Sequence, residues 1–236
     1  MSTDIYKTLD TISSSSRYNS WIYKKICPYL SGNVLDIGSG LGDIAQYYHL
    51  NPKVKQIILT DYSDEMLPRL KSRFAHLNSY RALKFDITAN RLDDLFSPQG
   101  IDTITCVNVL EHIENDVNAL NNMHSLLKKK GTLILLIPAL PQIYGTLDAL
   151  VGHYRRYTKT SLQKVIQKTN FTIVKQFYMN MFGIITWFIA GKILKQKSFN
   201  AKACKGLDKI VPVLEGIESF IQPPFGQSLI TICSAS

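Results

Sequence analysis

The chain has few cysteines, and none of them are paired at metal-ligand spacing. Cys27, Cys106, Cys204 and Cys233 are scattered over 236 residues without a CxxC motif. This distribution argues against a zinc site and against a disulfide framework. Cys106 and Cys233 stand in apolar runs, and we expect both to be buried.

Residues 1–16 contain no apolar core of the kind that a signal peptide has, and the chain contains no long apolar run. Residues 1–16 are polar and rich in Ser and Thr, so we expect a mobile leader and a cytoplasmic protein. An apolar and aromatic stretch from Asn180 to Leu194, within 180–197, is about fifteen residues long and too short to cross a bilayer. Three roles remain open for it: a helix on a membrane surface, a lid over a substrate, or a helix packed on the core.

Acidic residues are fewer than basic ones. The chain has 18 Asp and Glu against 27 Lys and Arg, a formal net charge of +9. This excess suits an anionic substrate, nucleic acid or an acidic membrane surface, but a Lys-rich solvated surface would also produce it. There is no recognisable nucleic-acid-binding module, and we expect no DNA partner.

The order of apolar segments predicts the fold. Strand-like runs begin near Val34, Lys55, Arg81, Ile101 and Thr132 and alternate with helical patterns, one of which extends to Lys130. Such alternation is typical of a doubly wound parallel α/β sheet.

The pattern changes after Pro138. A long polar and aromatic loop precedes a helix that begins at Thr158 or Thr160, a strand over 171–178 and a last strand over 228–233, which we expect to pair between the fifth and sixth strands. Residues 198–212 are basic and are expected to cover the surface. We therefore predict one domain over 17–236, with substrate or lid insertions at 139–157 and 179–224.

A glycine turn follows the first strand in Val34-Leu-Asp-Ile-Gly-Ser-Gly-Leu-Gly-Asp43. It does not fit the dinucleotide spacing GxGxxG, and it lacks the Lys and Ser/Thr of a P-loop. We expect a ligand at this turn, beside a helix that begins at Ile44. Asp36 would repel a pyrophosphate but suits a cationic amino-acid group. This combination points to S-adenosylmethionine, which has a sulfonium, an ammonium group, a ribose and an adenine.

Acids also end the next two strands. Asp61 stands where a strand-end carboxylate meets a ribose, and a carboxylate can accept hydrogen bonds from both ribose hydroxyls. Asp86 could accept a hydrogen bond from an adenine amino group or cap the following turn. Tyr62 and Met66 could cover an adenine face.

These features resemble the motifs of class I S-adenosylmethionine-dependent methyltransferases. The glycine run, Asp61, Asp86 and Asn108-Val-Leu-Glu-His-Ile match that family in order and position over residues 17–137. The resemblance implies a Rossmann-like, seven-stranded, mostly parallel sheet with an antiparallel last strand. The expected cofactor site comprises Asp36, Gly38, Ser39, Gly40, Asp61, Tyr62, Met66, Asp86, Ile87, Asn108 and Val109.

The second half is similar to a bacterial methyltransferase subgroup linked to glycan or lipid-carrier metabolism. The resemblance rests on Pro138-Ala-Leu-Pro-Gln-Ile-Tyr-Gly, Gly152-His-Tyr-Arg-Arg-Tyr-Thr and Pro224-Phe-Gly. It implies an acceptor that is a small molecule or is linked to a lipid or glycan.

Methyl transfer requires alignment of the acceptor, exclusion of water and, for a hydroxyl, removal of a proton. We expect His153 to accept that proton, with His112 as the alternative, unless His112 only packs beside the cofactor. Tyr154 would orient the substrate. The expected substrate-binding residues are Tyr18, Trp21, Arg155, Arg156 and Tyr157, although Tyr18 and Trp21 could pack on the sheet and the arginines could form a solvated turn. With no metal-ligating cluster in the sequence, we predict metal-independent catalysis.

The sequence thus predicts transfer of a methyl group from S-adenosylmethionine to an oxygen or nitrogen nucleophile. Three alternatives remain: an RNA methyltransferase, an NAD-dependent oxidoreductase on a related fold, and a non-catalytic S-adenosylmethionine-binding regulator. The glycine spacing argues against the oxidoreductase. Nothing in the sequence indicates the oligomeric state.

Overall fold

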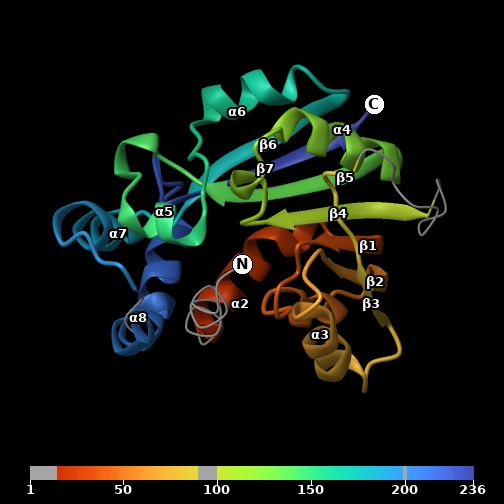
Figure 1. The fold of residues 1–236 in the computed structure, drawn as a ribbon, viewed down its shortest axis with the longest axis horizontal. Coiled ribbons are helices and arrows are strands. Elements are labelled where there is room, and N and C mark those ends of the chain that lie inside the picture. The colour runs from red at the N-terminus through yellow and green to blue at the C-terminus, as the bar shows by residue number, and fades with distance from the viewer. Residues whose placement is uncertain (1–14, 90–99, 199–200) are drawn as a thin grey trace.

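A single seven-stranded sheet runs through the protein, with helices on both faces (Figure 1). The structure is a computed structural model and describes residues 15–89, 100–198 and 201–236. Most of the predicted leader, residues 1–14, lies outside the described residues.

The sheet has the predicted topology. Its strand order is β3-β2-β1-β4-β5-β7-β6, and β7 runs antiparallel to both β5 and β6. The predicted Rossmann-like sheet and the insertion of the last strand between the fifth and sixth are therefore confirmed. The strands are β1 Gly32–Ile37, β2 Val54–Asp61, β3 Tyr80–Lys84, β4 Ile101–Val107, β5 Leu127–Pro138, β6 Phe171–Met179 and β7 Ser228–Ala235.

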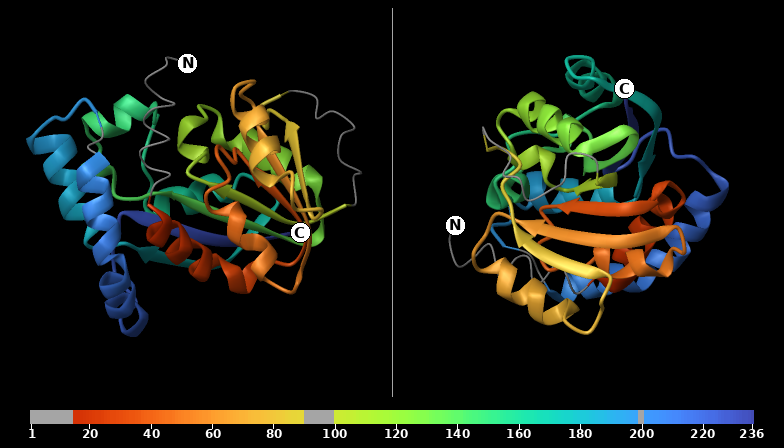
Figure 2. Two further views of the ribbon diagram at one scale, coloured as in Figure 1. Left: turned by 90° about the horizontal axis from the view of Figure 1, so that it is seen from below. Right: turned by 90° about the vertical axis from the view of Figure 1, so that its right-hand side faces the viewer.

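Helices cover both faces of the sheet and form a hydrophobic core on each (Figure 2). Leu120 of α4 and Leu162 of α6 pack on one face, and Trp21 of α2 and Leu70 of α3 pack on the other. Burial on both faces explains why the central strands are continuously apolar. The α-helices are α2 Ser16–Ile26, α3 Met66–Phe74, α4 Asp116–Leu126, α5 Thr146–Val151, α6 Lys159–Ile166, α7 Gly183–Phe188 and α8 Ala201–Phe220.

Short helical turns complete the fold. The 3-10 turns are η1 Cys27–Tyr29, η2 Ala45–Leu50, η3 Leu110–His112 and η4 Pro141–Ile143, and a π-helical turn, η5 Ile189–Ile193, continues α7. The helix expected after the glycine turn is thus only the six-residue η2. Pro52 explains its shortness, because a proline disfavours helical backbone at the preceding residue and Asn51 is extended.

One sequence-based boundary is wrong. The helix predicted to reach Lys130 ends at Leu126, and β5 begins at Leu127. Leu127 pairs with Ile101, and Lys128 Nζ lies 2.8 Å from Asp102 Oδ1, so contacts with β4 hold these residues in the sheet. The basic segment 198–212 was expected to cover the surface, and most of its residues from Ala201 onward are exposed. From Ala201 it belongs to α8, which contains Pro212 and packs on α2 through Val211.

Three of the helices after β5 gather at one end of the molecule. Figure 1 shows α5, α7 and α8 at the left, where the arrowheads of β4 and β5 point. Carboxyl ends of parallel strands are where ligands bind in such sheets. No helix within the described ranges is long and apolar enough to cross a membrane.

The glycine turn provides a test of the local backbone. Gly42 has φ +73°, and a Cβ there would collide with the ring of Phe74, whereas Gly40 has φ +55° and open space around it. We expect Gly42→Ala to lower the free energy of unfolding by about 3 kcal/mol, from backbone strain plus overpacking. Gly40→Ala should cost about 1 kcal/mol, from strain alone. Urea unfolding of both variants measures this, and equal losses would contradict the close packing on Phe74.

Candidate active site

The glycine turn after β1 is tied to the end of β2. Ser39 N–H donates to Thr60 O at 2.7 Å, and Thr60 N–H donates to Ser39 Oγ at 3.1 Å. On the other side, a Cβ added to Gly38 would lie 2.6 Å from Val109 Cγ2, beyond the end of β4. A Cβ added to Gly40 would meet no atom within 4 Å. The base of the turn is therefore fixed, and its tip leaves room for a ligand.

Asp61 connects the turn to the loop after β2. Its Oδ2 accepts the Gly40 N–H at 3.0 Å, and its Oδ1 accepts the Ser63 N–H at 2.9 Å. Burial raises the pKa of Asp61, and these backbone donors oppose the shift. The predicted pairing of Asp61 with a ribose is not tested by these contacts and stays a prediction.

Asp36 lies beneath the turn. It is nearly buried, and its Oδ1 accepts hydrogen bonds from the hydroxyls of Tyr48 and Thr105. Burial raises the pKa of Asp36 to about 6, although these hydrogen bonds act in the opposite direction. The predicted role beside a cationic group stays a prediction. Sequence analysis did not identify Tyr48 and Thr105 as its partners.

The other expected cofactor residues differ in exposure. Tyr62 is half exposed and Asn108 is exposed, so both can meet a ligand. Met66 and Ile87 are almost fully buried. Asp86 is exposed, and its Oδ1 accepts hydrogen bonds from the N–H and hydroxyl of Thr88. This is the turn-capping role that the sequence left open, and an adenine contact remains untested.

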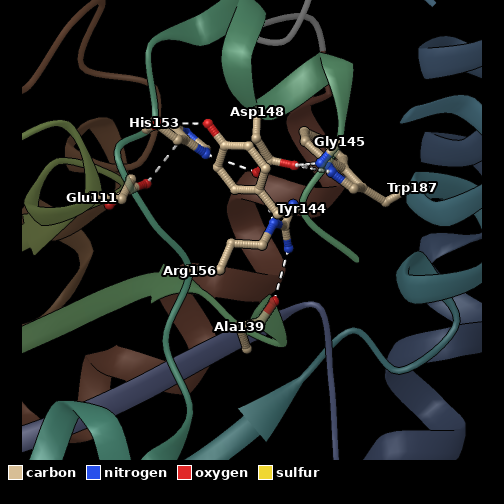
Figure 3. A network of polar contacts seen from close by, with 8 residues as sticks. All are labelled: Glu111, Ala139, Tyr144, Gly145, Asp148, His153, Arg156 and Trp187. Carbon is tan, nitrogen blue, oxygen red and sulfur yellow. Dashed lines mark hydrogen bonds and ion pairs between the residues drawn. The ribbon is translucent and has the colours of Figure 1, made fainter. Parts of the chain in front are cut away.

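A second polar group, which we call the Asp148 network, lies at the carboxyl end of the sheet (Figure 3). Asp148 is fully buried. Its Oδ1 lies 2.7 Å from Arg156 Nε and 3.0 Å from His153 Nδ1, and its Oδ2 accepts hydrogen bonds from Trp187 Nε1 at 2.9 Å and Gly145 N–H at 3.0 Å. Burial opposes ionisation, but His153 and Arg156 lower the pKa of Asp148 overall.

The ionised Asp148 fixes the orientation of His153. A carboxylate only accepts hydrogen bonds, so Nδ1 of His153 carries the proton and Nε2 of the neutral ring keeps its lone pair. Nε2 points toward Glu111, with 3.7 Å to Oε1 (Figure 3). The ring of His112 lies edge-on to His153, with 4.6 Å between centroids. The structure therefore brings the two predicted catalytic histidines together.

Glu111 is the buried acid of this group. Its side chain is fully buried, and neither carboxylate oxygen has a hydrogen-bond partner among the described residues. Burial raises the pKa of Glu111 to about 8, and burial together with His153 lowers the pKa of His112 to about 4. Tyr154 is exposed, and its N–H donates to Glu111 O at 2.9 Å.

Four of the five expected substrate-binding residues make structural contacts in the ligand-free protein, and their role in substrate binding stays a prediction. Trp21 has no exposed surface and packs in the core. Arg156 is buried, binds Asp148 and donates to Ala139 O at 2.8 Å, so an anionic substrate cannot reach it. Arg155 and Tyr157 both contact Asp116 Oδ2, at 3.0 and 2.9 Å. Tyr18 differs, because it lines a cavity between α2, α7 and α8.

Sequence analysis missed Asp148, Glu111 and Trp187. Asp148 carried a usable signal, because it is an acid within the otherwise apolar run Leu147-Asp-Ala-Leu-Val. An acid that a helix buries needs a cationic or hydrogen-bonding partner, and Arg156 follows in the same segment.

Comparison with known proteins agrees with this geometry. Residues 35–133 match the family model described as "Methyltransferase domain". A ubiquinone/menaquinone biosynthesis C-methyltransferase UbiE of Rickettsia typhi is 30% identical over 139 residues, which cover 56% of this chain and 56% of that protein. The chain thus matches little more than half the length of this relative.

Two solved structures share the fold. The S-adenosylmethionine-dependent methyltransferase from Clostridium acetobutylicum has a TM-score of 0.57 at 14% identity, covering 93% of this chain and 91% of that chain. Haemonchus contortus phosphoethanolamine N-methyltransferase 2, in complex with S-adenosyl-L-methionine, has a TM-score of 0.61 at 16% identity, covering 93% and 52%.

The match over residues 35–133 agrees with the predicted methyltransferase domain. The match favours a methyltransferase over the oxidoreductase alternative. The narrower resemblance to a glycan- or lipid-carrier-associated subgroup gains no support from these relatives and stays a prediction.

The buried state of Asp36 gives a test in the ligand-free protein. Its pKa is about 6 when folded and 3.8 in the reference state. The folded protein therefore retains a proton that the unfolded chain releases, and stability falls as pH rises from about 4 to about 6. Relative to Asp36→Asn, which cannot ionise, the wild type should lose about 3 kcal/mol over this interval. Urea unfolding at several pH values measures the difference, and parallel pH profiles would contradict it.

Proposed function

We propose that this chain, whose residues 35–133 match a methyltransferase domain, transfers a methyl group from S-adenosylmethionine to an acceptor with an apolar body. One observation carries the proposal for the acceptor. A cavity of about 260 Å³ lies between α2, α7 and α8, and its wall includes Trp187, whose indole N–H donates to Asp148. The Asp148 network thus connects the cavity wall to His153.

The glycine turn is the proposed donor site. The open tip at Gly40 accommodates a ligand, and Asp61, Tyr62 and Asn108 surround the carboxyl ends of the central strands. When bound, the sulfonium of S-adenosylmethionine supplies an electrophilic methyl group with a good leaving group. The chain's own residues then need to align the acceptor and exclude water.

The lining of the cavity supports an apolar acceptor. Most of its wall is made of aliphatic and aromatic side chains, as in sites for apolar small molecules. The aliphatic and aromatic wall residues are Tyr18, Leu147, Phe182, Trp187, Ala190, Ala203, Leu207, Ile210, Val211 and Leu214. Asn180, Gln196 and Gln227 also line it and offer polar contacts.

The outer surface beside the cavity supports an acceptor delivered from a lipid surface. Apolar side chains of α7, η5 and α8 are exposed there: Ile185, Ile189, Ile193, Leu194, Leu207, Ile210, Val213, Ile217 and Phe220. Exposed lysines accompany them: Lys192, Lys195, Lys197, Lys202, Lys205 and Lys209. Apolar side chains flanked by lysines favour binding to anionic membrane surfaces. Segment 180–197 therefore both walls the cavity and presents an apolar face, so the alternative of a core helix is the least supported.

The reactive end of the acceptor would lie at Glu111, His112 and His153. Nε2 of His153 can accept the proton that an oxygen or nitrogen acceptor releases. A carbon acceptor is the second candidate, because the Rickettsia typhi relative is named a C-methyltransferase. Mass spectrometry and NMR of a product made with deuterated methyl donor would identify the methylated atom.

The donor site is tested by Asp61→Ala. We expect loss of the carboxylate to weaken binding of S-adenosylmethionine at least tenfold in isothermal titration calorimetry, because a hydrogen bond to a charged group contributes about 1.5–3 kcal/mol. Asp61→Asn, which preserves the shape, should weaken binding less. Asp64→Ala is the control, because Asp64 is largely exposed and pairs with Lys84. Unchanged affinity in Asp61→Ala would contradict the ribose assignment.

The acceptor site is tested by filling the cavity. Ala190→Trp should lower kcat/KM for an apolar acceptor roughly tenfold, about 1.4 kcal/mol, and leave the affinity for S-adenosylmethionine unchanged. Ala201→Trp is the control, because Ala201 is exposed and does not line the cavity.

The assay supplies methyl-labelled donor and a solvent-extracted lipid fraction and follows label into the organic phase. Label found only in water-soluble products, or equal activity of the two variants, would contradict an apolar acceptor.

A further inference from the structure

Glu111, His112 and His153 form a group of potential metal ligands. Glu111 and His112 belong to η3 after β4, and His153 follows α5. One ligand atom from each side chain lies within 4.8 Å of the others. From the sequence, no role was assigned to Glu111 and it was not grouped with the two histidines, because His153 stands in a different element.

The carboxylate of Glu111 is the strongest sign of a missing partner. It is fully buried, and both of its oxygens lack hydrogen-bond partners within the described part of the chain. Buried polar atoms are nearly always satisfied, and an isolated buried charge is costly. A cation beside Nε2 of His153 would satisfy this carboxylate.

Both histidine rings have neighbours that limit their orientation. His153 Nδ1 lies 3.0 Å from the carboxylate of Asp148, and the backbone of Val151 and Gly152 lies beside the ring of His112. Metal-binding histidines are oriented in this way, by a carboxylate or a backbone carbonyl on the nitrogen that faces away from the metal. Asp148 in turn is fixed by Arg156 and Trp187.

We propose that Glu111, His112 and His153 bind one divalent first-row transition cation, such as Zn²⁺. Two imidazoles and one carboxylate form a ligand set that suits such ions, whereas Mg²⁺ prefers oxygen ligands. Three protein ligands leave a coordination position open for an exogenous atom. This proposal replaces the sequence-based expectation of metal-independent catalysis.

The position of the group gives the cation a role in the proposed reaction. Val109 packs against Gly38 of the glycine turn, and Glu111 follows two residues later. The open coordination position would therefore lie beside the proposed donor site and could hold an acceptor atom. While a cation is bound, Nε2 of His153 cannot also accept a proton, so the proton-accepting role applies to the metal-free protein.

The test is direct binding of Zn²⁺ and Co²⁺ to untagged, chelator-treated protein. Calorimetry with Zn²⁺ should show saturable binding of a single equivalent, and Co²⁺ should develop visible absorption of a nitrogen- and oxygen-ligated ion. Glu111→Gln and His153→Gln should each weaken Zn²⁺ binding roughly 100-fold, and Asp148→Asn roughly 10–100-fold. His76→Gln, at an exposed histidine outside the group, is the control and should bind as the wild type does.

Several outcomes would overturn the proposal. They are a wild type that binds neither ion saturably, full affinity in Glu111→Gln, or an equal loss in His76→Gln. Circular dichroism checks that each variant folds, and if Glu111→Gln does not, His153→Gln decides. Because neither S-adenosylmethionine nor an acceptor is present, a negative result would leave the proposed methyl transfer untouched.

Discussion

The buried carboxylate of Asp148 is the interaction on which the acceptor side of this structure depends. Its two oxygens bind groups from the residue before α5, from the segment after α5 and from α7, namely Gly145, His153, Arg156 and Trp187. Removing one partner of a buried charge pair typically costs about 3–5 kcal/mol, so these elements are coupled strongly. The same carboxylate sets the tautomer of His153 and fixes one wall of the cavity. Asp148 therefore determines both the orientation of the His153 ring and the position of Trp187 in the cavity wall.

The donor side depends on a different kind of constraint. There the backbone is fixed by Ser39, Thr60 and Asp61, and the glycines permit a turn that other residues would strain. Parallel strands place these residues at one edge of the sheet, and β4 places Val109 and Glu111 at the same edge. The sheet thus brings the donor turn close to Glu111, His112 and His153, although these residues are far from the turn in the sequence.

The strands and the glycine turn were predictable because their signals are local. Apolar runs, alternate glycines and acids at strand ends each lie within a few residues. The helix end near Lys130 was mispredicted because Ile101 and Asp102, on another strand, hold Leu127 and Lys128. The partners of Arg155, Arg156 and Tyr157 could not be predicted either. Asp116 and Asp148 come close to them only when the chain has folded. Trp21 is buried in the core, as the alternative of packing on the sheet predicted from its helical spacing.

We propose that a donor at the glycine turn presents its methyl group to the Glu111, His112 and His153 group, with the acceptor body between α7 and α8. A crystal structure with S-adenosylhomocysteine tests this most directly. The account predicts the ribose at Asp61 and the thioether sulfur facing His153, with the cavity beside Trp187 open to the same space. A product bound with its sulfur directed away from His153, or separated from the cavity by the chain, would contradict it.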